Sequence, residues 1–326
     1  MRSTETIGLK MQHFLLSPAS RTLSVAKVAR MDDVEVLEAF KNIRWASTAG
    51  EPVCPRCSCL ECWGYKTRKL YRCKGCDHMY SVTSGTIFSN RKLHVRDYLL
   101  AIILFVNGSK GRSALQMSRE LDVQYKTAFV LCHKMREAMA IETIDAKVSG
   151  EVEVDGAYFG GHVKPSNFKE NRRDRRLAEN QTGKRRVVVI MRERKGRTLP
   201  FVFKAEHQSI NLIADRVKVG STIYADEAMH WDALHSLYLT KRINHQEAYS
   251  ANGASTNMAE SFFSRLRRAE IGTHHHISGK YLVSYAREMA WREDYRRVGN
   301  GEQFLMVANA ALTNPVSRNW KGYWQR

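Results

Sequence analysis

The sequence predicts a multidomain α+β protein, and three observations in chain order support this fold class. Two Cys-x-x-Cys pairs lie near the N-terminus, an amphipathic helical hairpin follows, and strand-like segments then alternate with helices. We expect five parts. They are a helical segment over residues 1–50, a cysteine domain over 51–90, a helical region over 91–147, an α/β domain with a mixed sheet over 148–298, and a C-terminal helix and tail over 299–326.

Composition restricts the class of partner. The chain has 326 residues, of which 43% are hydrophobic, so it can bury a core and is not a disordered polycation. Its 52 Lys and Arg against 33 Asp and Glu give a net charge of +19, which favours a polyanionic partner. No segment approaches the roughly 18 apolar residues of a spanning helix, and the N-terminus lacks a signal-peptide pattern. We therefore expect a cytoplasmic protein with no membrane partner, whose cysteines are ligands rather than disulfides.

The two cysteine pairs have the spacing of a zinc ribbon. Fifteen residues separate them, and each pair places two thiolates on one turn of the backbone. The thiolates predicted to bind one structural Zn²⁺ are those of Cys54, Cys57, Cys73 and Cys76. Cys59 and Cys62 offer alternative pairings, but the simplest interpretation leaves both in the loop or strand between the pairs. We expect ribbon strands around residues 63–65 and 70–71, and another strand and turn over Tyr80–Phe88.

Helical periodicity is clear both before and after the ribbon. Apolar residues at spacings of three predict a helix over Asp32–Trp45. Further helices are expected from Val95 to Asn107, from a cap at Ser113, and over residues 124–140. The last two form a helix-turn-helix pattern, whose second helix would read DNA, although short helical hairpins are also common in protein cores. Its exposed candidates for DNA contact are Gln124, Tyr125, Lys126 and Lys134.

A strand predicted over Glu151–Phe159 carries a carboxylate of special interest. Its period of two places Val152, Val154 and Tyr158 on a core face and turns Glu153 and Asp155 the other way. Taken alone, Asp155 is most simply a strand acid that accepts backbone hydrogen bonds. In a basic protein it could also belong to a metal site that acts on phosphates, provided that partner carboxylates follow.

A basic segment follows this strand over residues 162–186. It has no apolar period, and its simplest interpretation is a solvated insertion. Its charge density favours contact with a phosphate backbone, which gives affinity without sequence readout. The candidates for this contact are Arg172, Arg173, Arg175, Arg176 and Lys184.

Partner carboxylates occur further along the chain. Strands are expected over 187–192, 199–204 and 242–245, and Asp226 ends a short buried strand over 221–226. Glu260 lies in the first turn of a helix that opens at Asn257, although these two residues could instead form a capping box. Three carboxylates can hold two divalent ions about 4 Å apart, and oxygen ligands favour Mg²⁺ or Mn²⁺ over zinc. Each acid alone favours a structural interpretation, whereas the order strand Asp, strand Asp, helix Glu favours a catalytic one.

These motifs together resemble bacterial insertion-sequence DDE transposases with an N-terminal zinc ribbon, the ISXO-type group, over about residues 32–298. Besides the cysteine pairs, the resemblance rests on Ser84-Gly-Thr86, Val152-Glu-Val-Asp155, Tyr158-Phe-Gly-Gly161, Tyr224-Ala-Asp226, Thr256-Asn-Met-Ala-Glu260 and Gly272-Thr-His-His-His-Ile-Ser278. It implies a ribonuclease H-like catalytic fold, with Asp155, Asp226 and Glu260 as the metal-binding triad. Arg267, two helical turns after Glu260, stands where such enzymes usually have a lysine.

The resemblance also implies a function and partners. The protein would be a DNA transposase that binds double-stranded DNA at the terminal inverted repeats of its element and at the target. It would then cleave and join strands with two Mg²⁺ or Mn²⁺ ions, as a homodimer or larger assembly in the bacterial nucleoid. His275 lies in a run of three histidines that cannot all face one ion, and we expect it on a loop that contacts DNA or borders the catalytic site. A non-catalytic DNA-binding regulator and a nuclease that does not join strands are the alternatives.

Overall fold

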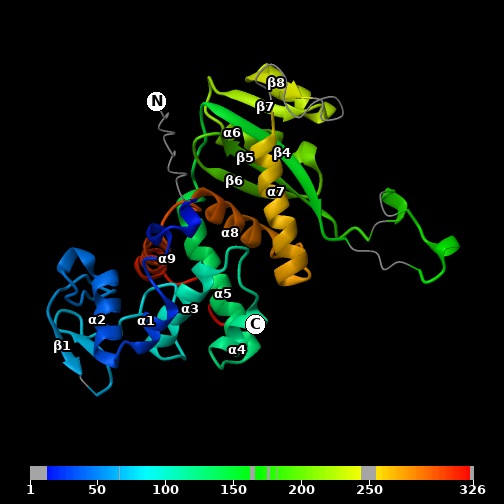
Figure 1. Cartoon of the computed structure of the whole chain (residues 1–326). Coiled ribbons are helices and arrows are strands. Elements are labelled where there is room, and N and C mark those ends of the chain that lie inside the picture. The colour runs from blue at the N-terminus through cyan, green and yellow to red at the C-terminus, as the bar shows by residue number, and fades with distance from the viewer. Residues whose placement is uncertain are drawn as a thin grey trace, which may run out of the picture.

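The protein has two lobes. The computed structural model describes residues 13–65, 67–161, 166–174, 177–180, 182–243 and 255–323. The N-terminal lobe contains residues 13–144 and 300–323, and the sheet lobe contains residues 148–294. Helix α8 (Leu282–Asp294) lies between the lobes (Figure 1). The described residues between strands β4 (Glu151–Phe159) and β5 (Arg186–Glu193) form an arm that projects away from the sheet (Figure 1).

The ribbon of the N-terminal lobe has three antiparallel strands: β1 (Cys62–Tyr65), β2 (Leu70–Cys73) and β3 (Met79–Tyr80). The first two confirm the predicted ribbon strands. The strand and turn predicted over Tyr80–Phe88 are both present, with the strand ending at Tyr80 and turns over most of the following residues. Hydroxyl groups satisfy the backbone of this turn, as where Thr86 Oγ1 donates to Thr83 O at 2.7 Å. Ile87 and Phe88 are nonetheless buried, which explains their apolar character.

Five helices of the N-terminal lobe follow the predicted positions within one or two residues where a prediction exists. They are α1 (Val25–Arg30), α2 (Asp33–Arg44), α3 (Val95–Asn107), α4 (Ala114–Glu120) and α5 (Tyr125–Ala140). A capping box starts α2, since Asp32 Oδ1 accepts from the Glu35 amide at 2.8 Å and the Glu35 carboxylate accepts from the Asp32 amide at 2.8 Å. The buried face of α2 contains Val36 and Phe40, whereas Val34 is 69% exposed.

The C-terminal helix α9 (Asn300–Thr313) returns to the N-terminal lobe. It packs against α2, α3 and α5, and its Phe304 and Val307 belong to the same core as Phe40 and Ile102. The two ends of the chain therefore complete one hydrophobic core. Sequence patterns assign no role to this helix, because its partners all end at least 160 residues earlier in the chain, at Ala140 or before.

Five strands in the order β6-β5-β4-β7-β8 form the mixed sheet of the second lobe. The remaining strands are β6 (Thr198–Phe203), β7 (Thr222–Asp226) and β8 (Leu239–Ile243). β4, β5 and β6 are antiparallel neighbours, whereas β7 runs parallel to both β4 and β8. The strands expected over 151–159, 187–192, 199–204 and 221–226 are confirmed. The last predicted strand, from Arg242, begins earlier, and its residues 244–245 lie outside the described part of the chain.

Helices cover both faces of this sheet. α6 (Ile210–Arg216) and the 3₁₀ helix η8 (Met229–Ser236) pack on the face that carries Val152 and Val154. α7 (Asn257–Ala269) and α8 pack on the other face, against Ala157 and Phe159. Glu153 faces the opposite way from Val152 and Val154, as expected, but α7 covers that face as well, so Glu153 is only 1% exposed. Tyr158, expected in a core, is 36% exposed and lies under the Arg185 guanidinium, 4.3 Å from the ring centre.

A buried charge network connects the lobes. Glu288 of α8 is fully buried and accepts hydrogen bonds from Arg136 of α5 at 2.6 Å and from Arg292 at 2.9 Å. Arg292 also donates to Phe105 O and Val106 O at the end of α3, at 2.7 and 3.1 Å. Burial alone would raise the pKa of Glu288, but the two arginines hold it below its usual value. The carboxylate is therefore ionised and paired on both sides.

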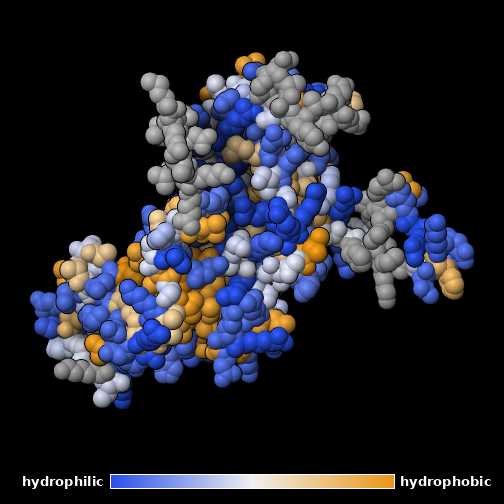
Figure 2. Space-filling model, viewed as in Figure 1, coloured by the Kyte–Doolittle hydropathy of each residue, from blue (hydrophilic) through white to orange (hydrophobic). Residues whose placement is uncertain are grey.

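The surface reflects this division into lobes. Figure 2 shows apolar residues on the N-terminal lobe over α1 and α9, whereas hydrophilic residues cover most of the sheet lobe and the arm. Within the described ranges, no helix combines the length and the apolar character that a membrane span requires.

Candidate metal centres and nucleic-acid contacts

The four predicted cysteines of the ribbon meet in one cluster. Their sulfur atoms all lie within 4.8 Å of one another, with Cys54 Sγ 3.7 Å from Cys76 Sγ and Cys57 Sγ 3.4 Å from Cys73 Sγ. Four cysteine thiolates so arranged are the ligand set of a structural zinc site.

Two similar backbone turns build this cluster. In the first, Ser58 N donates to Cys54 O at 2.9 Å, and in the second, Asp77 N donates to Cys73 O at 3.1 Å. Ser58 and Asp77 both have positive φ, which reverses the chain directly after each pair. Cys59 and Cys62 lie outside the cluster, as the simplest interpretation of the sequence expects.

Two predicted carboxylates lie on neighbouring strands of the sheet. β4 and β7 are parallel, and Glu153 is paired with Tyr224. Asp155 and Asp226 each follow that pair by two residues, so they occupy equivalent positions on adjacent strands and point to the same face. Both side chains are partly buried. Glu260 is exposed in the first turn of α7, the helix that packs on this face of β4.

Electrostatics indicate that these acids share one site. Burial raises the pKa of Asp155 to about 7; the Gly156 amide opposes this rise, and Asp226, Glu206 and Glu260 add to it. Among the described residues, only the four cysteines bring three or more ligand atoms within 4.8 Å of one another. The oxygen atoms of these acids are therefore further apart than that as a group. They are near enough to repel one another, and a divalent cation would relieve that repulsion.

Glu206 is a fourth carboxylate here, and sequence patterns do not reveal it. It lies in the 3₁₀ helix η7 (Glu206–Ser209) after β6, and a Cβ atom at Gly156 would come 2.6 Å from its Oε1. His230 Nε2 lies 3.4 Å from its other oxygen. Burial and the charge of Asp226 raise the pKa of Glu206. The signal in the sequence is Gly156, because a glycine inside a strand often marks close approach by another group.

Glu153 fastens α7 to β4. Its Oε2 accepts from the amides of Met258 and Ala259 at 2.9 and 3.1 Å, and its Oε1 faces Arg194 Nε at 3.1 Å. A carboxylate at a helix N-terminus satisfies amides that have no partner within the helix and interacts favourably with the helix dipole. The predicted capping box of Asn257 with Glu260 is wrong, because Thr256 precedes the helix and no side chain of that position caps it.

We expect Glu153→Ala to lower the free energy of unfolding by about 3 kcal/mol, because it leaves two helix amides without their acceptor and removes the buried one of the two carboxylates that pair with Arg194. Chemical denaturation of the full chain measures this change. Glu151→Ala is the matched control, since Glu151 lies on the same strand and also pairs with Arg194, but has a carboxylate side chain that is 52% exposed. An exposed pair contributes about 0–1 kcal/mol. Equal losses in both variants would contradict the capping role of Glu153.

The predicted DNA contacts on α5 divide into two groups. Gln124, Tyr125 and Lys126 are exposed at the N-terminal end of the helix. Lys134, expected to be exposed, is partly buried, and its ammonium donates to Ser89 O at 3.4 Å. Burial lowers the pKa of Lys134. The expectation of an exposed side chain is wrong there because the segment after the ribbon covers this part of α5.

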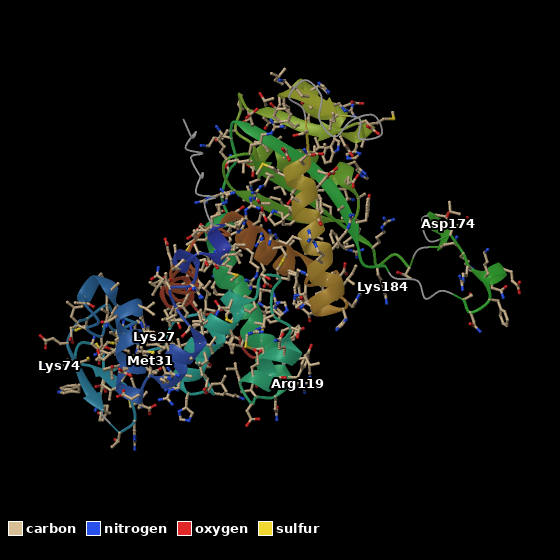
Figure 3. The ribbon with its side chains drawn as sticks, in the orientation of Figure 1. Lys27, Met31, Lys74, Arg119, Asp174 and Lys184 are labelled. Carbon is tan, nitrogen blue, oxygen red and sulfur yellow. The ribbon has the colours of Figure 1, made fainter. Side chains whose placement is uncertain are left out.

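The remaining predicted contacts lie on the arm and near the end of α7. Arg172, Arg173 and Lys184 are exposed on the arm, and Figure 3 shows Lys184 near its base and Asp174 further out. Arg175 and Arg176 lie outside the described residues. Arg267 and His275 are exposed.

The three consecutive histidines do not face one point. His274 turns inward, with its ring centre 4.6 Å from that of Tyr285, whereas His275 has a φ of 59° and is exposed. Burial lowers the pKa of His274 to about 4. A metal site built from all three histidines is therefore not formed.

Comparison with known proteins identifies two domains in the chain. Residues 147–294 match the ISXO2-like transposase domain, and residues 31–79 match the transposase zinc-ribbon domain. The two domains together define an insertion-sequence transposase. The chain therefore contains an ISXO2-like transposase domain and a transposase zinc-ribbon domain.

One curated relative supports this assignment. It is described as an uncharacterized protein in transposable element ISH50 of Halobacterium salinarum, and it is 26% identical over 281 residues. The match covers 83% of this chain and 94% of the relative. No solved structure gives a significant match.

Proposed function

We propose that this transposase binds the ends of its element through the N-terminal lobe and catalyses metal-dependent strand cleavage and strand transfer in the sheet lobe. The observation that carries the proposal is the position of Asp155 and Asp226 at equivalent points of adjacent parallel strands. Glu260 extends from the helix that covers the same face. This arrangement supports an Asp-Asp-Glu triad rather than three unrelated structural acids.

The folds of both lobes support the proposal. Three antiparallel strands followed by two parallel ones, in the order β6-β5-β4-β7-β8, are the arrangement expected of a ribonuclease H-like fold. In the N-terminal lobe, α4 and α5 are joined by a short turn at residues 121–124. This supports a helix-turn-helix, in which the exposed N-terminal end of α5 would face the DNA groove.

Asp155, Asp226 and Glu260 would hold the catalytic ions. Carboxylate oxygens fit Mg²⁺ or Mn²⁺, and the mutual repulsion of these acids favours bound cations. Two such ions activate a water or a 3′-hydroxyl and stabilise the leaving oxygen of an in-line displacement. The four cysteines would hold a structural Zn²⁺.

Other residues position the substrate and the triad. Glu153 holds the start of α7, so it sets where Glu260 stands relative to Asp155. Arg267 follows Glu260 by about two helical turns on the same exposed side of α7 and is suited to a phosphate of the DNA. The arginines and lysines of the arm would contact the backbone without reading its sequence. Strand transfer joins two element ends to a target, so we expect a dimer or larger assembly on DNA.

Joining of pre-cut ends tests the proposed function. Full-length protein is incubated with DNA from the sequences that flank its own gene, cut at the element boundary, and the joined product is measured. We expect joining in Mg²⁺ or Mn²⁺ and none in EDTA. Cleavage of uncut DNA without joining of pre-cut ends would indicate a nuclease. Specific binding with neither reaction would indicate a regulator.

A further inference from the structure

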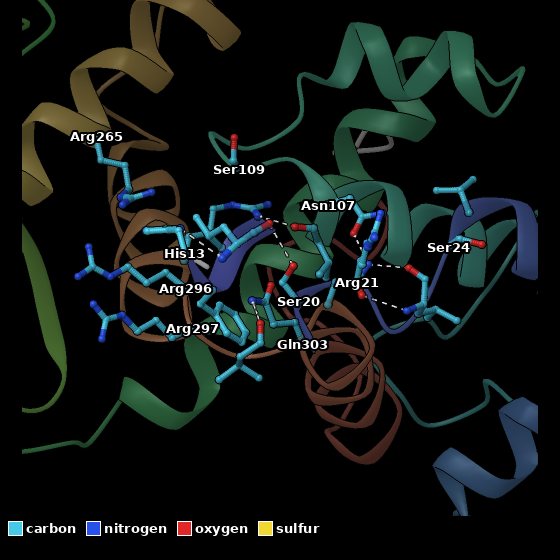
Figure 4. Close-up of a pocket in the computed structure, with 18 residues that line it drawn as sticks. His13, Ser20, Arg21, Ser24, Asn107, Ser109, Arg265, Arg296, Arg297 and Gln303 are labelled. Atoms are coloured by element: carbon cyan, nitrogen blue, oxygen red, sulfur yellow. Dashed lines mark hydrogen bonds between the residues drawn. The ribbon is translucent and has the colours of Figure 1, made fainter. Parts of the chain in front are cut away.

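A pocket of about 630 Å³ lies where the first described segment of the chain crosses the junction of the two lobes. Its walls come from residues 13–25, the end of α3, the last turns of α8 and the start of α9, with Arg265 of α7 (Figure 4). It is separate from the carboxylates of the sheet, because it contains none of them.

The walls of the pocket are held together by hydrogen bonds and close backbone contacts. Asn300 accepts from the Leu23 amide at 3.0 Å and donates to Leu23 O at 2.6 Å and to Asn107 Oδ1 at 2.9 Å. A Cβ atom at Gly299 would come 2.7 Å from Ala19 O, and one at Gly301 would come 2.6 Å from Thr22 Oγ1. The two glycines therefore let the N-terminal segment lie directly on the start of α9. The pocket exists before any ligand binds.

The lining is strongly cationic. Five arginines and His13 contribute to it, and no carboxylate does. The five are Arg21, Arg265, Arg292, Arg296 and Arg297. Figure 4 shows three of them, Arg265, Arg296 and Arg297, on one side of the lining residues and Arg21 on the other, with the side chains of Arg296 and Arg297 extending outward. So many like charges around one space favour an anionic ligand.

Three of these arginines already have acidic partners behind the pocket wall. Arg292 pairs with Glu288, and Arg265 and Arg296 share Glu293, at 2.5 and 3.0 Å. Arg21 and Arg297 differ, since both are exposed and neither has an ion pair with any described residue. Two exposed guanidinium groups of the pocket lining are therefore available to a ligand.

We propose that this pocket binds phosphate groups of the DNA backbone, through Arg21 and Arg297, at a site distinct from the metal-binding carboxylates. The guanidinium group matches the geometry of a phosphate and stays charged at every physiological pH. The identity of the polyanion rests on the proposed function, because DNA is the substrate of a transposase. The site lies at the junction of the lobes, so a duplex seated there contacts both.

The salt dependence of DNA binding tests this inference. Binding of full-length protein to a fluorescein-labelled duplex of about 30 base pairs is measured by anisotropy at several salt concentrations. Each lost phosphate contact reduces the slope of log K against log salt by about 0.9. We therefore expect Arg21→Ala/Arg297→Ala to reduce the slope by about 2 and to weaken binding at 0.1 M salt about tenfold or more. Arg21→Lys/Arg297→Lys should keep most of the slope.

Arg30→Ala/Lys218→Ala is the matched control, because it removes two exposed cations outside the pocket. It should leave the slope within about 0.5 of the wild-type value, and thermal unfolding checks that all variants are folded. A wild-type slope in the Arg21/Arg297 alanine variant would overturn the inference, as would an equal loss in the control. A wild-type protein that does not bind DNA would overturn the proposed function instead.

Discussion

Replacing Asp155 or Asp226 with asparagine should reduce strand cleavage and joining by at least about 10³-fold, while leaving DNA binding within about twofold of wild type. Metal ions contribute several kcal/mol to such displacements, and each 1.36 kcal/mol is a factor of ten in rate. An amide replaces one anionic oxygen with a donor, so it binds Mg²⁺ or Mn²⁺ poorly. Joining of pre-cut ends measures the reaction, and anisotropy with the same DNA measures binding.

The stability of the Asp155→Asn variant provides the control for folding. The pKa of Asp155 is raised to about 7 by burial and neighbouring acids, above its ordinary value of 3.8. Without metal, the folded state therefore loses stability as pH rises from the ordinary value through 7, because ionisation is less favourable there than in the unfolded chain. Asparagine avoids this charge, so at pH 8 in EDTA the variant should unfold at a temperature no lower than wild type. Normal joining by either asparagine variant would refute the triad.

Replacing Cys54 or Cys76 with serine should remove the zinc and unfold the ribbon. Binding of structural zinc contributes about 10–16 kcal/mol in isolated zinc domains, and a missing thiolate removes most of it. Cys54 and Cys73 are buried in the core that also contains Phe40 and Ile102, so the loss should spread through the N-terminal lobe. Metal analysis should fall from one equivalent per chain to near zero. Near-ultraviolet circular dichroism should lose the signal of Trp45, which packs edge-on against Tyr71.

Cys59→Ser is the matched variant for this experiment. Cys59 lies five residues from Cys54 and is partly buried, but its sulfur is outside the four-cysteine cluster. We expect it to retain one equivalent of zinc and the wild-type dichroism spectrum. Loss of zinc from this variant, as complete as from Cys54→Ser, would contradict the ligand set.

Helices and strands could be predicted from the sequence where caps and apolar periodicity within the segment determine them. The capping residue Ser113 and the apolar period of residues 95–106 predict α4 and α3 nearly to the residue, and the structure agrees. A strand and a turn are predicted over Tyr80–Phe88, but the pattern does not show that the strand ends at Tyr80, where hydroxyl groups begin to bond the backbone into turns. The sequence of α9 has an ordinary helical pattern. Its position beside α3 depends on contacts between residues that are far apart in the sequence, which such a pattern does not reveal.

Residues of the candidate site could be predicted from the sequence only where the residue type and its position on a helix or strand by themselves indicate a metal ligand. Asp155 and Asp226 are such residues, since an acid on or at the end of a buried strand is unusual. Glu206 and Glu153 are not, because their importance depends on Gly156 and on the amides of α7, which lie far away in sequence. The apparent capping box of Asn257 with Glu260 does not form, because the Glu260 amide donates to Thr256 O and the buried Glu153 carboxylate accepts from the amides of Met258 and Ala259.

The pairing of Glu288 with Arg136 and Arg292 has a mechanical consequence. Separating the lobes would leave buried charges without partners, at a cost of about 3–5 kcal/mol, so the lobes resist rotation about α8. Under the proposed function, the DNA sequence held by the N-terminal lobe and the phosphodiester at the carboxylates keep a constant separation. The protein then holds these two sites at a fixed distance. The DNA, rather than the protein, bends so that the phosphodiester reaches the carboxylates.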